Sequence, residues 1–263
     1  MTVVLCAAAL AAGAVRQETP PDVYLFDCGG TVQRLSDADV PAGDARRVSD
    51  LDPALPSEVR DGCAILSGWY DTGSSQLLLR VQTAGRQRGD STPTRMLALA
   101  VPGLVPVGRG IQAAPRFERS ARAELIRQVR RLEAPFPRSI AYVLNGYDSV
   151  LFQELQEDSS AGPMSVQPDI LWRAGTVSLR EAHPHATGRY AVADLSTGAV
   201  RGSVVTAPQG SAQQRVVCFT PQGRVYVAAA RDTLAVLDTT HSDGRAVQAA
   251  VTLDLYWTAC AWE

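Results

Sequence analysis

The sequence predicts an all-β protein whose strand hairpins repeat along the chain. Short runs rich in valine, leucine, tyrosine and alanine alternate with tight polar turns, which is the pattern of β-hairpins. The chain also contains 21 glycines and 16 prolines, spread along its length as many turns require. A third observation is that hairpins at the two ends of the chain share one sequence pattern. Together these features favour a single repetitive β domain.

The shared pattern is clear when the two hairpins are aligned. VYLFDCGGTVQRLS (23–36) aligns without a gap with VYVAAARDTLAVLD (225–238). A strand that holds Cys218 precedes the second copy, and the equivalent strand for the first copy lies at the C-terminus, in DLYWTACAWE. The last strand of the chain is therefore expected in front of the first. A ring of sheets that closes by joining its two ends in one sheet has this arrangement.

Four further segments have the same strand, turn, strand plan. They are GCAILSGWYDTGSSQLLLRV (62–81), SIAYVLNGYDSVLFQEL (139–155), RYAVADLSTGAVRGSVV (189–205) and LDTTHSDGRAVQAAVTL (237–253). In the third of these, Asp194 is placed to cap the turn and Gly198 to take a positive φ. A unit of about 40 residues is the usual length of a propeller blade. We therefore predict a β-propeller of about five irregular blades over 21–263, closed by its N- and C-terminal strands, with one helical insertion.

The second copy of the repeat resembles the YVTN repeat of quinoprotein-type propellers, in which VYVTN is followed by VSVID. Val225-Tyr226-Val227 and Leu234-Ala235-Val236-Leu237-Asp238 match that pattern, whereas Ala228 and Ala229 replace Thr-Asn. The resemblance implies a propeller blade. It does not imply an activity, because such repeats occur in both enzymes and scaffolds.

The stretch around Asp27 also has an outline of the nucleophile loop of haloacid-dehalogenase enzymes, in which a strand ends in D-x-D-x-T. Those enzymes need a second aspartate two residues further on, and Gly29 occupies that position here. We therefore expect a structural role, in which Asp27 ends a strand, Gly29 and Gly30 form a turn, and Thr31 begins the next strand.

The N-terminal residues 1–20 are predicted to be an export signal or a disordered N-terminus. Residues 1–14 are apolar, and Ala12-Gly13-Ala14 offers a small-residue cleavage site. The stretch is too short to span a bilayer, so no transmembrane segment is expected. A secreted or periplasmic location follows from this interpretation.

Four cysteines remain after such a signal: Cys28, Cys63, Cys218 and Cys260. An even number in an exported chain fits one or two disulfides, with four separate thiols as the alternative. Because Cys28 and Cys260 fall in adjacent strands of the expected closing blade, we predict that they form a disulfide.

One segment, 118–135, has the apolar spacing of a helix, and the expected insertion covers 116–133. Six arginines stand against three glutamates over 116–133. The arginines either lie in water or form a docking surface for an anionic partner or a membrane surface. The residues assigned to such a surface are Arg119, Arg122, Arg127 and Arg130.

His183 and His185 lie two residues apart in EAHPHATG, where two imidazoles can share a divalent metal if the loop holds them open. A surface loop with free histidines is the alternative interpretation. The net charge of -2 gives no electrostatic basis for nucleic-acid binding.

The sequence favours a non-catalytic function, because no nucleophile and base set and no phosphate-binding loop is visible in it. We expect an exported binding or protein-interaction scaffold, with an unknown protein or a small anionic ligand as partner and no cofactor. One alternative is a lactonase-like or quinoprotein-like enzyme with a metal or cofactor at the top face of the propeller. Another is a subunit of a larger assembly that pairs through exposed blade edges.

Overall fold

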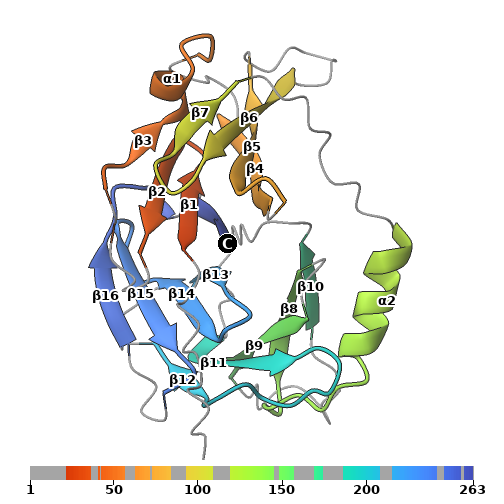
Figure 1. Cartoon of the computed structure of the whole chain (residues 1–263). Helices are drawn as coiled ribbons and strands as arrows, with labels where there is room; N and C mark the ends of the chain where they lie inside the picture. The colour runs from red at the N-terminus through yellow and green to blue at the C-terminus, as the bar shows by residue number, and fades with distance from the viewer. Residues whose placement is uncertain are drawn as a thin grey trace, which may run out of the picture.

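The computed structural model describes residues 22–36, 41, 43–56, 63–71, 73–83, 93–108, 119–144, 148–156, 169–173, 186–207, 215–241, 246–255 and 258–262. Within these residues the chain forms four β-sheets and two helices. Figure 1 shows the sheets arranged around a common centre, near which the C-terminus lies. The prediction of an all-β protein is confirmed.

The first sheet is built from both ends of the chain, and we call it the terminal sheet. Its strands, in spatial order, are β17 (Thr258–Trp262), β1 (Val23–Asp27), β2 (Thr31–Leu35) and β3 (Arg46–Arg47). Strand β17 runs antiparallel to β1, with Val23 opposite Trp262 and Asp27 opposite Thr258. The predicted place of the last strand, in front of the first, is confirmed.

The other three sheets follow in chain order. The second sheet contains β4 (Ile65–Asp71), β5 (Gln76–Gln82), β6 (Thr94–Ala100) and β7 (Val105–Val107). The third contains β10 (Asp169–Arg173), β8 (Ser139–Leu144), β9 (Ser149–Leu155), β11 (Ala186–Asp194) and β12 (Val205–Thr206), and β10 is parallel to β8. The fourth contains β13 (Arg215–Phe219), β14 (Arg224–Ala228), β15 (Thr233–Asp238) and β16 (Ala246–Ala250).

The predicted count of about five blades is wrong, because the described residues form four sheets. Two predicted hairpins, 139–155 and 189–205, belong to one sheet, since β9 pairs with β11. A hairpin pattern in sequence shows only that two strands are neighbours. It does not show which hairpins share a sheet, and counting each hairpin as the start of a blade therefore overestimates the number.

Neighbouring sheets are joined by shared hydrophobic cores. In β1, Val23 and Leu25 belong to the core shared with the third and fourth sheets, and Tyr24 and Phe26 belong to the core shared with the second sheet. This follows from the alternation of side chains along a strand. All four side chains are at most 2% exposed, so β1 is buried on both faces.

The described residues do not close a ring. No hydrophobic core formed by them joins the second sheet to the third. The face of the third sheet turned away from the fourth is instead packed against the segment that contains helix α2 (Arg119–Val129), through Val129, Leu125 and Leu132. The helix predicted near 116–133 is therefore present, and it caps one end of an arc of sheets (Figure 1). The other helix, α1 (Val48–Leu51), packs Val48 and Leu51 into the core between the terminal and second sheets.

Two disulfides connect the terminal sheet to its neighbours on either side. Cys28 is bonded to Cys63, which lies just before β4, and Cys218 of β13 is bonded to Cys260 of β17. The predicted Cys28–Cys260 disulfide is therefore wrong. The register of the terminal sheet places Cys260 opposite Leu25, so the two side chains share the face turned toward the fourth sheet. Cys28 instead lies in the turn beyond the end of β1, and its bond to Cys63 connects it to the residues that precede β4 of the second sheet.

Candidate functional site

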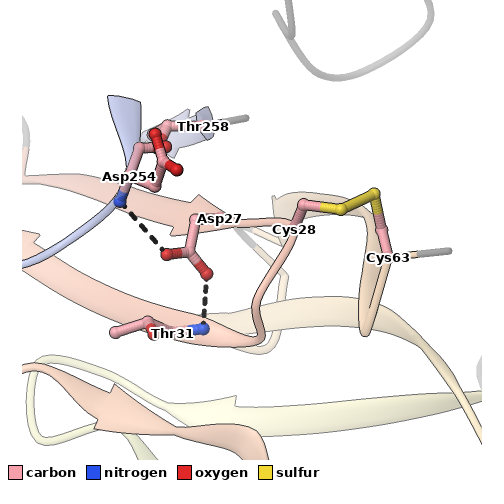
Figure 2. Close-up of a disulfide and its surroundings, with 6 residues drawn as sticks. All are labelled: Asp27, Cys28, Thr31, Cys63, Asp254 and Thr258. Atoms are coloured by element: carbon pink, nitrogen blue, oxygen red, sulfur yellow. Dashed lines mark hydrogen bonds between the residues drawn. A yellow bond between two sulfur atoms is a disulfide. The ribbon is translucent and has the colours of Figure 1, made fainter. Parts of the chain in front are cut away.

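A buried polar region lies where the two ends of the described chain meet, at the end of β1. We define the terminal junction as Asp27, Gln33, Thr252 and Asp254. Asp27 is only 6% exposed, and its Oδ1 accepts the backbone N–H of Thr31 at 2.8 Å. Its Oδ2 accepts the backbone N–H of Asp254 at 3.3 Å, as Figure 2 shows. One buried carboxylate thus accepts a hydrogen bond from a backbone N–H near each end of the chain.

A second bond of the same kind lies nearby. The side-chain Oε1 of Gln33, in β2, accepts the backbone N–H of Thr252 at 3.1 Å, and Gln33 is 3% exposed. The segment between these two bonds then continues into β17, where the Oγ1 of Thr258 donates to the backbone carbonyl of Asp254 at 2.8 Å. The approach of β17 to β1 is therefore fixed by buried side chains as well as by strand pairing.

The local sequence explains this geometry. Strand β1 ends at Asp27 and β2 begins at Thr31, with Gly30 at φ +91° in the turn between them. A positive φ is readily adopted by glycine and rarely by other residues. The strand, turn, strand arrangement predicted around Asp27 is confirmed. No local pattern predicts its bond to Asp254, because the two residues are 227 positions apart and that amide reaches Asp27 only after folding.

Burial raises the pKa of the Asp27 carboxyl above its ordinary value, and the amide bonds from Thr31 and Asp254 act against this rise. The negative charge of Asp254 raises the pKa of Asp27 as well. Asp254 in turn forms an ion pair with the exposed side chain of Arg231, at 2.8 Å. With both oxygens of Asp27 accepting backbone amides, the arrangement is suited to holding the chain ends together.

A second charged cluster centres on Arg201, which sequence analysis did not single out. Its guanidinium reaches Asp194 at 2.6 Å and Asp148 at 3.0 Å, and it donates to the Oγ of Ser149 at 3.0 Å. Hydrogen bonds from Ser196 and Arg201 hold the pKa of Asp194 well below its usual range, and Arg201 also lowers the pKa of Asp148. The cluster ties the turn after β11 to the start of β9.

The predicted role of Asp194 in its turn is confirmed. Its Oδ1 accepts the backbone N–H groups of Ser196 and Thr197, both at 2.9 Å. Gly198 has the positive φ that was expected, at +74°. The D-x-x-T-G pattern was thus a reliable local signal, but it carried no information about the arginine that faces the same carboxylate from seven residues away.

The arginines predicted to bind a partner lie on or just after helix α2. Arg127 is exposed and forms an ion pair with Glu124 at 2.5 Å, and Arg130 and its neighbour Arg131 are exposed just beyond the helix end. The backbone of Arg119 and Arg122 belongs to the same helix. Positions 127, 130 and 131 are spaced so that they share one side of a helical turn. The opposite side is fixed by Val129, which is fully buried.

The predicted metal ligands His183 and His185 lie outside the described residues. Among the residues that are described, no group of three or more histidine, cysteine, aspartate or glutamate side chains is arranged to hold a metal ion. In the same part of the chain, no helix is long and apolar enough to cross a membrane.

Comparison with models of known protein families gives no match for this chain, and comparison with curated protein sequences gives none either.

Proposed function

We propose that this protein is an exported β-propeller-type scaffold that binds an acidic protein partner through the basic side of α2. The observation that carries the proposal is the placement of the exposed arginines. Arg127, Arg130 and Arg131 project from a segment whose other side is held in a hydrophobic core with the third sheet. A cluster of positive charge on a packed segment attracts a negative surface, and its backbone does not have to become ordered on binding.

The charge on this surface is only partly neutralised within the described chain. Glu124 pairs with Arg127, but both side chains are about half exposed or more, and such a pair contributes little to stability. Arginine is also the cation that best matches carboxylates, because its planar guanidinium can donate two parallel hydrogen bonds. An acidic protein segment therefore fits this surface better than an uncharged ligand does.

Two features support the wider proposal of an exported propeller-type protein of the YVTN kind. The two disulfides indicate an oxidising compartment, since such bonds are rare where thiols are kept reduced. A secreted or periplasmic location with a cleaved N-terminal signal accounts for them. The pairing of the last strand with the first, in an arc of four- and five-stranded sheets, supports propeller-type architecture.

A charge-reversal experiment tests the proposed binding surface. The variant carries Arg127→Glu, Arg130→Glu and Arg131→Glu, and its matched control carries Arg46→Glu and Arg47→Glu in β3, where both arginines are also exposed. The probe is a fluorescein-labelled polyglutamate peptide, and its binding is followed by anisotropy at low and at physiological salt.

We expect the wild type and the control to bind the peptide and the α2 variant to lose binding, with wild-type affinity falling as salt rises. Equal binding by the two variants, or no binding by the wild type, would overturn the proposal. Vesicles containing anionic phospholipid serve as a second probe. Binding to vesicles without binding to the peptide would show that the surface recognises a membrane instead of a protein.

A second candidate function, as a subunit of a larger assembly, is favoured by one face of the second sheet. On that face Val105 and Val107 of the edge strand β7 are 58% and 36% exposed. Leu78 and Ala98 on the same face are buried, at 2% and 7% exposed, so among these residues the exposed apolar surface is confined to the edge strand. Native mass spectrometry tests this candidate: a stable oligomer that Val105→Arg dissociates would support it, and a wild-type monomer would contradict it.

A further inference from the structure

The two disulfides differ sharply in their access to solvent. Cys218 and Cys260 are both 0% exposed and lie within the core between the terminal and fourth sheets. Cys28 and Cys63 are each half-buried, and their bond lies beyond the end of β1, at the turn that leads to β2 (Figure 2). A thiolate must reach a sulfur atom to reduce a disulfide, so access determines which bond reacts in the folded protein.

The accessible disulfide lies at a contact between the turn after β1 and the residues that precede β4. The backbone carbonyl of Cys28 accepts the N–H of Ala64 at 2.8 Å, beside the sulfur bridge. Gly30 lies against the same residue so closely that a Cβ placed on Gly30 would stand 2.9 Å from the Cβ of Ala64. The carbonyl of Gly30 also accepts the N–H of Val48, the first residue of α1. The turn after β1, the start of β4 and helix α1 therefore meet at this bridge.

The same turn contains the carboxylate of the terminal junction. Asp27 precedes Cys28 directly, and its main-chain carbonyl accepts the N–H of Gly30 at 3.2 Å. Its side-chain carboxylate accepts the backbone N–H of Thr31, the first residue of β2, and the backbone N–H of Asp254 in the C-terminal segment. Displacement of Cys28 therefore changes the position from which Asp27 binds the C-terminal segment.

We propose that the Cys28–Cys63 disulfide is a redox-sensitive latch that controls how firmly the chain ends are joined. A dithiol reductant opens it. One thiolate of the reductant attacks one sulfur and forms a mixed disulfide, and the second thiolate then displaces that sulfur. The Sγ–Sγ bond breaks, both cysteines become thiols with the gain of two electrons and two protons, and the reductant becomes a disulfide.

Opening the latch leaves the fold in place. Tyr24 and Phe26 still pack against Leu77 and Leu79 between the terminal and second sheets. The Cys218–Cys260 disulfide still joins the terminal sheet to the fourth. The change is local, confined to the turn, to the start of β4 and to the amide of Asp254.

The first test is selective reduction. The folded full-length protein is treated with a low concentration of dithiothreitol and then alkylated, and the modified peptides are identified by mass spectrometry. We expect alkyl groups on Cys28 and Cys63 while Cys218 and Cys260 remain disulfide-bonded until denaturant is added. Reduction of both disulfides at one rate, or of Cys218–Cys260 first, would overturn the proposal.

The second test measures the structural consequence by hydrogen exchange of backbone amides. After selective reduction we expect the amides of Thr31, Ala64 and Asp254 to exchange faster by roughly tenfold or more, and those of Val216–Phe219 to be unchanged. Unchanged exchange at all three amides would show that the bridge is not a latch.

A matched variant separates the latch from a general effect of reductant. The double substitution Cys28→Ala and Cys63→Ala is expected to show the fast exchange without dithiothreitol and no further change with it. If that variant does not fold, the reduction and exchange measurements on the wild-type protein still decide the question, since they need no substitution.

Discussion

The side-chain Oδ2 of Asp27 accepts the backbone N–H of Asp254 at 3.3 Å, across 227 residues of sequence. The bond joins the end of the first strand to the segment that leads into the last one. Together with the bond between Gln33 and Thr252, it places β17 against β1 in a single register. The two ends of the chain are thus joined through buried polar side chains, and substitution of these side chains tests each bond.

Replacing Asp27 by alanine removes the acceptor of two backbone amides. We expect Asp27→Ala to lower the free energy of unfolding by about 1–3 kcal/mol, the usual cost of leaving buried donors without partners. Denaturant unfolding followed by tryptophan fluorescence measures the change. The control is Asp254→Ala, which keeps the backbone N–H that Asp27 binds and removes the partly exposed ion pair with Arg231. An equal loss in both variants would contradict a specific role for the Asp27 carboxylate.

Removing the buried disulfide is expected to cost more than removing any single hydrogen bond. Cys218 and Cys260 are 42 residues apart, and closing a loop of that length contributes about 4 kcal/mol in the chain-entropy model. The variant with Cys218→Ala and Cys260→Ala is therefore predicted to unfold at a much lower denaturant concentration. A change below about 1 kcal/mol would show that the core between the terminal and fourth sheets holds without the covalent link.

The Arg201 cluster predicts a loss of stability in acid. Asp194 and Asp148 have lowered pKa values in the folded protein, so they contribute stability above their unfolded pKa of about 4. This contribution disappears as the pH falls through the folded values. Asp27 acts in the opposite sense: its raised pKa means that folding is less favourable with Asp27 ionised than with Asp27 protonated, and this difference disappears as the pH falls.

The variant Arg201→Gln tests whether the ion pairs of Arg201 are the source of this loss of stability in acid. We expect it to be less stable than the wild type at pH 7 by about 1 kcal/mol, because the pairs are partly exposed. The difference should shrink as the pH is lowered from 5 to 2. Denaturant unfolding at a series of pH values measures it. A difference that grows in acid would show that the two aspartates are not stabilised by Arg201.

Gly68 is predicted to be intolerant of even a methyl group. A Cβ at this position would stand 2.7 Å from Leu79 Cδ2 and 2.8 Å from the ring of Phe26, between the second and terminal sheets. Gly68→Ala should therefore destabilise the protein by about 1–3 kcal/mol, as overpacking of a core usually does. Thermal unfolding measures this, with Gly108→Ala as the control because nothing lies within 4 Å of a Cβ there. Similar melting temperatures for the two variants would contradict the close approach of the sheets.

Most of the strands could be predicted from local patterns in the sequence. The alignment of 23–36 with 225–238 predicted the pairing of β17 with β1, because a missing strand in one copy had to be supplied from elsewhere. The pattern around Asp194 predicted its capped turn and the positive φ of Gly198. In each case the signal lay in neighbouring residues or in a direct repeat.

The predictions that were wrong depended on long-range register. Pairing Cys28 with Cys260 required knowledge of which face each cysteine occupies, and one register position of the terminal sheet decides this. The number of sheets depended on whether β11 pairs with β9, which no local pattern reveals. The bonds of Asp27 to Asp254 and of Arg201 to Asp148 also arise only when distant segments meet.

The most direct test of the account is a non-reducing peptide map of the native protein. The chain contains arginine and no lysine, so trypsin places Cys28, Cys63, Cys218 and Cys260 in four separate peptides. If the terminal sheet lies between the second and fourth sheets as described, mass spectrometry will find Cys28 linked to Cys63 and Cys218 linked to Cys260. A peptide pair joining Cys28 to Cys260, or four free thiols, would contradict it.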